Sequence, residues 1–384
     1  MNKLVCRIKL KAFTVIFMAI CVTGCVDPVT PEFQFQEGLV FIEGFVSTTV
    51  GGSFITINES AEEFGVRVVR FIPGATVQFE NLDSGLTISL EEAGDSYLPS
   101  PDFAATPGET WKLNIIMPNG KNYESEPERI LAPVAITDLE VRYDPELVFR
   151  EIYGGKFVPG HAISVSFDDP SEVDNYYYWS YRTFESQNYC LKCIEGIYRD
   201  GACMSADLPG RGTRYYDYIC ETDCWRIRFP ESVNIYSDEF SNGNTVSKLP
   251  VGDLLLYTKE NMVVELQQFS LTPAAYDYYK VLKDIVDNSG GLNAPPPAAL
   301  IGNLFNSDNP DDIILGRFTA ASSSVASIFV ERGVTISEPP LESVGPIVLE
   351  PLIGSPFPPP ATNFAPCGES KFRTAVEPSA WIEL

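Results

Sequence analysis

The chain has 384 residues, a formal net charge of −25 and a single histidine. A body this acidic is repelled by nucleic acid and by anionic lipid surfaces, so the composition argues against a nucleic-acid partner. Aromatic residues make up 12% of the chain, and 28 glycines and 30 prolines supply many turns. This mixture is typical of an all-β globular protein, and the length suits about two domains.

The N-terminus predicts a lipoprotein signal peptide. Four basic residues precede an apolar stretch at 12–22, and the segment ends in the sequence VTGC at 22–25. The apolar stretch is about half of the ~20 residues that a membrane-spanning helix needs. We therefore expect residues 1–24 to be removed, Cys25 to carry a diacylglyceryl group, and residues 25–37 to form a lipidated tether. Cleavage changes the net charge to −29, because four of the 27 basic residues are lost.

Short strands are expected throughout the region after the tether. Apolar or alternating runs predict strands at 39–46, 53–58, 75–80, 87–90, 111–117 and 122–125. The sequence Pro118-Asn119-Gly120-Lys121 is typical of a tight β-hairpin turn between the last two of these. Strands at roughly ten-residue spacing, with no helical pattern between them, predict a β-sandwich domain over 33–132.

The remaining residues, 133–384, predict a larger β-rich domain with one helix. Strand patterns recur at 136–143, 161–167, 175–184, 225–229 and 253–269. The helix is expected over 273–288, because Thr272 is a good N-cap and Pro273 suits the first helical position. The run GRFTAASSSVASIFV at 316–330 predicts a hairpin, and the following segment is rich in proline and therefore extended.

Six cysteines remain once those of the signal peptide and the lipid site are set aside. They are Cys190, Cys193, Cys203, Cys220, Cys224 and Cys367. An even number outside the cytoplasm predicts three disulfides, for which 15 pairings are open. We expect the stretch 190–224 to be an excursion held by disulfides rather than by a core, and Cys367 to pin the C-terminal tail to the body. The spacing also fits a zinc knuckle, but we predict no metal.

No catalytic centre is expected. His161 is the only histidine, so neither a Ser-His-Asp nor a Cys-His arrangement can be built without it. It lies before an alternating strand, and we interpret it as a surface or strand-edge residue. No motif for binding a nucleotide or dinucleotide, and none for a zinc hydrolase, is present, so no cofactor is predicted.

Two acidic clusters and one aromatic stretch are the remaining candidates for a ligand site. The clusters contain Asp168, Asp169, Glu172 and Asp174 in the first and Asp308, Asp311 and Asp312 in the second. Either could bind calcium or supply the two carboxylates of a glycosidase, but neither matches an EF-hand loop, and we interpret both as solvated turns. In the aromatic stretch at 175–184, alternation places one face in the core and leaves the other as a candidate surface for a sugar, a peptide or a protein partner.

The order of several short motifs resembles a family of Bacteroidetes outer-membrane lipoproteins known as domain of unknown function 4249. The resemblance rests on Cys25, LVFIEG at 39–44, PGATV at 73–77, PGETWKL at 107–113, Cys224-Trp225, the helix region 270–286, PPP at 295–297, Gly302-Asn303, LGRF at 315–318, Cys367 and PSAW at 378–381. Such proteins are often encoded beside TonB-dependent receptors, which implies an accessory role. The first domain is also similar to immunoglobulin-like and carboxypeptidase-regulatory-like sandwiches, a likeness of fold alone. The family transfers no catalytic residue.

The sequence therefore predicts a lipid-anchored outer-membrane protein, on the periplasmic face or at the cell surface, that binds without catalysing. Its expected partners are the membrane, through the lipid, and a TonB-dependent receptor. A surface adhesion or structural module is the alternative, and a hydrolase that uses carboxylates alone is a third.

Overall fold

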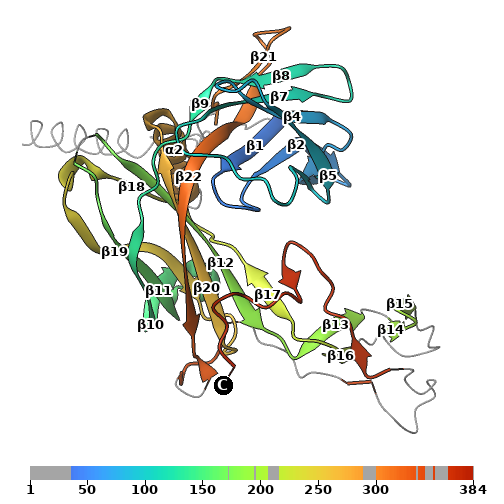
Figure 1. Cartoon of the computed structure of the whole chain (residues 1–384). Coiled ribbons are helices and arrows are strands. Elements are labelled where there is room, and N and C mark those ends of the chain that lie inside the picture. The colour runs from blue at the N-terminus through green and yellow to red at the C-terminus, as the bar shows by residue number, and fades with distance from the viewer. Residues whose placement is uncertain are drawn as a thin grey trace, which may run out of the picture. The chain divides into compact units, whose positions relative to one another are not determined.

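The computed structural model describes residues 36–171, 173–193, 196–205, 216–288, 300–333, 336–341, 349–350 and 362–383. The predicted signal peptide, Cys25 and nearly all of the tether lie outside these residues. The described chain is mostly strand, as predicted, and α2 (Pro273–Asn288) is the one α-helix in it (Figure 1). Two short 3-10 helices are η1 (Glu151–Tyr153) and η2 (Asp238–Phe240).

The strands of the first half are β1 (Val40–Ser47), β2 (Phe54–Glu63), β3 (Val66–Phe71), β4 (Thr76–Asn81), β5 (Thr87–Ala93), β6 (Ser96–Leu98), β7 (Thr110–Ile116), β8 (Asn122–Ser125), β9 (Glu128–Arg129), β10 (Ile136–Arg150), β11 (Lys156–Asp168) and β12 (Tyr176–Ser186). Those of the second half are β13 (Tyr189–Cys193), β14 (Gly196–Arg199), β15 (Ala202–Ser205), β16 (Tyr216–Cys220), β17 (Trp225–Arg228), β18 (Asn234–Ser237), β19 (Thr245–Leu255), β20 (Met262–Leu271), β21 (Leu304–Asn306), β22 (Ile314–Val330), β23 (Phe364–Ala365) and β24 (Arg373–Thr374). Thirteen of these strands follow one another as neighbours in the order β21-β8-β7-β4-β5-β6-β2-β1-β22-β20-β12-β17-β24 of one large sheet.

The first hydrophobic core confirms the alternation that predicted its strands. Val77 and Phe79 of β4 and Leu113 and Ile115 of β7 are buried, while the residues between them are not. They meet side chains from β1 and β2, among them Ile42. The predicted hairpin turn is also present, because β7 and β8 pair antiparallel around it. Period-two burial on paired strands produces the sandwich expected for this region.

Strand β22 belongs to two cores. Residues 314–321 pair in parallel with β1, and residues 322–330 pair antiparallel with β20. The hairpin predicted over 316–330 is therefore wrong: each half of the segment has a partner strand, so the run of small residues continues straight instead of turning. Gly316 is required at the parallel pairing, because its φ is +102° and a Cβ atom there would lie 1.9 Å from the carbonyl oxygen of Ile42.

The second core lies between β12, β20 and β22 of the large sheet and a three-stranded sheet in the order β10-β11-β19. Residues 38–384 form one compact unit that holds both cores. The composition of the core changes near residue 132, where a domain boundary was expected, but β21 and β22 complete the first core from the far end of the chain. The division into domains at 132 and 133 stays a prediction.

Helix α2 begins and ends where the sequence predicted. The backbone N–H of Ala275 donates to the Thr272 hydroxyl at 3.3 Å, which is the expected N-cap bond. Ala275 and Tyr279 are buried against β12 and β20, and the Tyr279 ring stacks on Tyr178 with centroids 4.8 Å apart. Leu282 is only half-buried. The helix therefore covers the face of β12 that points away from the second core.

Candidate functional site

The six cysteines form three disulfides. They join Cys190 to Cys220, Cys193 to Cys203 and Cys224 to Cys367. The third disulfide links the C-terminal segment to the start of β17, as the sequence predicted for Cys367. Because all six sulfurs are oxidised, none is available as the thiolate ligand that a zinc knuckle needs.

The described part of the disulfide-linked excursion, residues 190–224, has a core of its own. Tyr198, Tyr216 and Tyr218 pack with Ile197 and the half-cystines, and Ala365 of the C-terminal segment completes the cluster. The prediction of an excursion without a core is therefore wrong. The sequence pattern failed because this core is built from tyrosines and cystines in a polar stretch, not from a periodic aliphatic run.

A buried ion pair ties the excursion to the C-terminal segment. Arg199 donates from Nη1 to a carboxylate oxygen of Glu350 at 2.9 Å, and its second terminal nitrogen contacts the other oxygen. The Tyr218 hydroxyl also donates to Glu350, at 2.7 Å. A two-point contact satisfies the buried carboxylate and fixes its orientation. Residues 151 positions apart in the sequence are thereby held together.

Apolar side chains are exposed on this excursion. Ile219 and Phe364 are paired in register between β16 and β23, and Leu349 forms an isolated bridge with Asp217 beside them. All three apolar side chains are at least two-fifths exposed. In Figure 1, β13 and β16 lie beyond the ends of β12 and β17, away from the two main cores. The excursion and the C-terminal segments paired with it therefore present an apolar surface patch, made of Ile219, Leu349 and Phe364, on a cross-linked frame.

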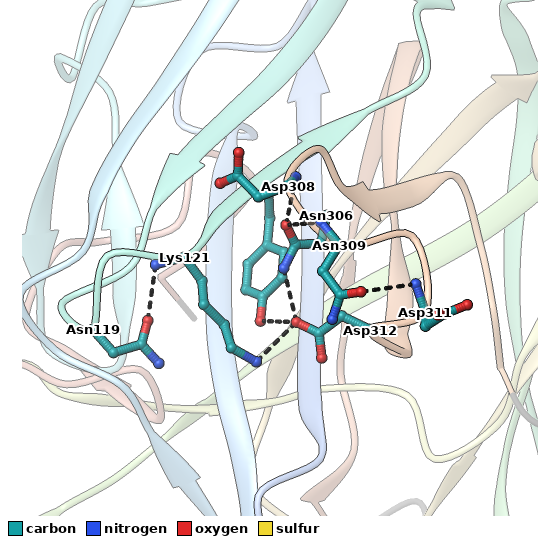
Figure 2. A network of polar contacts seen from close by, with 8 residues as sticks. Asn119, Lys121, Asn306, Asp308, Asn309, Asp311 and Asp312 are labelled. Atoms are coloured by element: carbon teal, nitrogen blue, oxygen red, sulfur yellow. Dashed lines mark hydrogen bonds and ion pairs between the residues drawn. The ribbon is translucent and has the colours of Figure 1, made fainter.

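The second acidic cluster has a structural role, because its Asp312 connects two loops through hydrogen bonds. Figure 2 shows its loop lying against the β7–β8 hairpin. The Asp312 carboxylate accepts hydrogen bonds from Lys121 Nζ at 2.8 Å, from Asn306 Nδ2 at 2.9 Å and from the Tyr123 hydroxyl at 3.1 Å. The hydrogen bond from Lys121, followed by that from Asn306, lowers the pKa of Asp312. A carboxylate neutralised by a lysine and two further donors joins two loops, and it is a poor calcium ligand.

The first acidic cluster is divided between the surface and the interior. Asp169 is buried and accepts from the Tyr177 hydroxyl and from the Gly243 backbone N–H, while Asp168 accepts from Thr245 at the surface. Burial raises the pKa of Asp169. Glu172 lies outside the described residues. The two adjacent carboxylates therefore serve separate structural contacts.

His161 is buried, not a surface residue as the sequence suggested. Its strand, β11, pairs on one side with β10 and on the other with β19, so it is not at an edge. Burial, followed by the nearby charge of Arg332, lowers the pKa of His161 to about 4. The imidazole is therefore neutral at physiological pH. Its ring lies edge-on to Tyr143, with centroids 5.4 Å apart.

Both faces of the aromatic strand β12 are covered. Tyr177, Trp179 and Tyr181 are buried in the second core, which confirms the predicted core face. Tyr176 and Tyr178 on the other face pack against α2. The proposed ligand surface on that face is therefore occupied by the helix.

An open pocket of about 520 Å³ lies where β17 and β19 approach the segment before β24. Its lining combines aromatic rings with side chains of both charges: Tyr181, Arg226, Arg228, Phe229, Glu231, Asp253, Tyr257 and Phe372. This volume falls within the usual range for small-molecule sites. The pocket is therefore a candidate ligand site on the described surface.

The charged groups of the pocket are held in place by partners. The Arg228 guanidinium lies 4.3 Å from the centroid of the Tyr257 ring, a cation–π contact. The Tyr257 hydroxyl donates to Glu231, and Arg150 lies 3.8 Å from the same carboxylate. Burial raises the pKa of Asp253 against the opposing charge of Arg150. These contacts pre-organise the pocket walls.

A buried ion cluster lies directly behind Arg228. Arg228 donates from Nε to one carboxylate oxygen of Glu185 at 2.7 Å. Arg332 donates from Nη2 to the other oxygen at 2.9 Å. Glu185 and Arg332 are almost completely buried. Burial alone would raise the pKa of Glu185, but the charges and hydrogen bonds of the two arginines outweigh it, and the pKa lies below its ordinary value.

Comparison with known protein families shows the family to which this chain belongs. A model of the domain of unknown function DUF4249 matches residues 26–327. The chain belongs to the DUF4249 family. The match spans α2 and five of the six disulfide cysteines, while Cys367 lies beyond it. No curated protein and no solved structure matches. Among the described residues of this DUF4249 protein, no helix is long and apolar enough to cross a membrane.

Sequence reasoning missed the pocket of the DUF4249 protein. Its residues come from β12, β17, β19, the segments that follow β17 and β19, and the segment before β24, and none belongs to a recognisable motif. One signal was present: WRIRF at 225–229 alternates arginine with apolar residues directly after a cysteine. Only the pairing of β17 with β12 shows where those arginines meet aromatic rings.

Proposed function

We propose that this DUF4249 protein is a non-catalytic, lipid-anchored binding component of a bacterial outer membrane, working beside a TonB-dependent receptor. The observation that carries the proposal is the apolar patch of Ile219, Leu349 and Phe364, formed by the disulfide-linked excursion and the C-terminal segments paired with it. The signal sequence ending at Cys25 supports the lipid anchor. The family resemblance supports the choice of receptor.

The frame beneath the patch suits recognition of another protein. A surface that is fixed before binding loses little conformational entropy on association. The three disulfides and the Arg199–Glu350 pair provide such a frame. Anchoring by lipid would add to the affinity, because it raises the local concentration of the protein beside membrane partners.

The test is affinity purification of the tagged full chain from gently solubilised native membranes. The double variant Ile219→Ser/Phe364→Ser should lose a TonB-dependent receptor that the wild type retains. A matched control is Ile116→Ser/Ile313→Ser, which removes two exposed apolar side chains from other regions of the body. Equal recovery of the receptor with the patch variant, or a wild-type chain that purifies alone under every condition, would contradict the proposal.

One observation favours a second candidate, a glycoside hydrolase that uses carboxylates alone. The pocket holds Glu231 and Asp253, and burial raises the pKa of Asp253. Such an enzyme requires two carboxyl groups at one site, one of them an acid with a raised pKa. Release of reducing sugar from a glycan panel by the wild type, and its loss in Asp253→Asn, would establish hydrolysis and displace the non-catalytic role.

A further inference from the structure

The tip of the β2–β3 hairpin carries a phenylalanine in an unfavourable position. The turn is Glu63-Phe64-Gly65-Val66, with φ values of +52° at Phe64 and +80° at Gly65. Two-residue hairpin turns with positive φ at both positions strongly prefer asparagine or glycine. A bulky residue there is an outlier, and such backbone strain is concentrated at functional sites. The Phe64 side chain is also fully exposed.

The rest of this hairpin gives no structural reason for the aromatic tip. Val66 and Val69 of β3 are each more than three-fifths exposed, as parts of the same ribbon. In the described chain, β3 has β2 as its only partner strand. A two-stranded ribbon is marginally stable in water. Three apolar side chains that remain exposed to water add nothing to its stability. A surface that covers these side chains would account for them.

The hairpin tip lies at the same end of β2 as Gly38, the first residue of the compact unit. The Gly38 N–H donates to the Ser60 carbonyl at 2.8 Å, and the Leu39 N–H donates to the Ser60 hydroxyl at 3.0 Å. Since β1 runs antiparallel to β2, Gly38 and Leu39 lie beside Ser60, at the end of β1 nearer the hairpin turn. Phe64 lies four residues further along β2, or ~13 Å at the usual rise of a strand.

The same end of the body is close to the lipid site in terms of chain length. Cys25 precedes Gly38 by 13 residues, which span at most about 45 Å when fully extended. A lipid on Cys25 therefore limits how far this end can move from the bilayer. We propose that the β2–β3 tip is a second membrane contact, with Phe64 and Val66 entering the interfacial region of the bilayer. This inference rests on the proposed lipidation of Cys25.

The charges of the ribbon indicate which lipid surface it suits. Arg70 forms an ion pair with Glu59, and Arg67 lies opposite Glu62 in the strand register. The ribbon therefore has no excess of basic charge with which to attract anionic lipid. Phenylalanine and aliphatic side chains of surface-bound segments bury at the headgroup–acyl boundary, and an apolar contact added to a lipid chain strengthens anchoring. The tip should thus contact a zwitterionic surface.

The experiment uses the lipidated full-length mature protein in vesicles of phosphatidylcholine and phosphatidylethanolamine. Phe64→Trp places a fluorescent reporter at the tip, and Phe240→Trp is the matched control, because Phe240 is equally exposed on η2, outside the ribbon. Emission is recorded relative to the wild type, whose own tryptophans are common to both variants. Vesicles with brominated acyl chains then measure contact with the bilayer.

We expect Phe64→Trp emission to shift to shorter wavelength on reconstitution and to be quenched by brominated lipid, while Phe240→Trp shows neither effect. Vesicle flotation and intact mass report the lipid anchor separately. A floating, lipidated protein whose Phe64→Trp reporter is unchanged overturns the second contact and leaves the anchor intact. Loss of flotation with an unlipidated mass overturns both. A Phe64→Trp shift that requires an added receptor, without lipid quenching, assigns the tip to a protein partner and also overturns the proposal.

Discussion

Replacing Glu185 with glutamine tests whether the buried cluster behind the pocket is held by charge. In the native protein one carboxylate serves both Arg228 and Arg332 through hydrogen bonds of 2.7 and 2.9 Å. Arg332 is fully buried, so Glu185→Gln removes a carboxylate charge that lies against a buried guanidinium. Breaking a buried pair in this way costs about 3–5 kcal/mol, and we expect the free energy of unfolding to fall by that amount.

The assay is urea denaturation at pH 7, followed in parallel by tryptophan fluorescence and circular dichroism so that the two transitions can be compared. Glu265→Gln is the matched control, because Glu265 pairs with Arg182 at the surface, where the arginine side chain is 50% exposed. An exposed pair of this kind is worth under about 1 kcal/mol. If the Glu185→Gln loss is no larger than that of Glu265→Gln, the reasoning about the buried cluster is refuted.

The pH dependence of the free energy of unfolding is a second test of the charge on Glu185. The pKa of Glu185 in the folded protein lies below its ordinary value of 4.5, so the unfolded chain takes up the proton first as the pH falls. The contribution of Glu185 is therefore fully present above about pH 4.5 and is lost as the pH falls through the folded pKa. The stability difference between wild type and Glu185→Gln should shrink over that range. If the single variant does not fold, Glu185→Gln/Arg332→Met should recover stability, because it removes the buried charge with its partner.

Three further predictions concern the anchor, the disulfides and the helix. Cys25→Ser should leave the protein unprocessed or release it from membranes, and normal membrane retention of a correctly cut chain would rule out lipidation. Cys224→Ser/Cys367→Ser should lower the free energy of unfolding by about 2–5 kcal/mol and expose the C-terminal segment to limited proteolysis; unchanged protease resistance would contradict the predicted role of this disulfide. Tyr279→Ala should cost about 3–5 kcal/mol in urea denaturation and Leu282→Ala only about 1–2, because Leu282 is half-buried; the reverse order would mean that the buried face of α2 is misassigned.

Local patterns in the sequence were enough to define many elements of this protein. Burial on alternate residues identified β4 and β7, because one face of each strand must be apolar to contact the first core. The start of the helix followed from Thr272 and Pro273, whose cap bond and fixed φ act within a single turn. An even number of cysteines outside the cytoplasm predicted disulfides. Each of these signals depends only on neighbours along the chain or on composition.

Features that depend on distant neighbours were decided by the tertiary structure. The polar run in β22 reads as a turn until β1 and β20 are present to pair with its two halves. His161 reads as a strand-edge residue until strands lie on both sides of it and Arg332 is brought close from the C-terminal part of the chain.

The pocket, the disulfide pairing and the apolar patch of the excursion also depend on the tertiary structure. Their parts come from segments as far apart as Cys224 and Cys367, which are separated by 143 positions. Hydrogen bonding and packing across such distances leave no periodic trace in the sequence, because a residue's partner is chosen by the fold and not by its spacing along the chain. The sequence by itself determined the local elements and the oxidising compartment expected for the protein. The tertiary structure alone decided which side chains face one another.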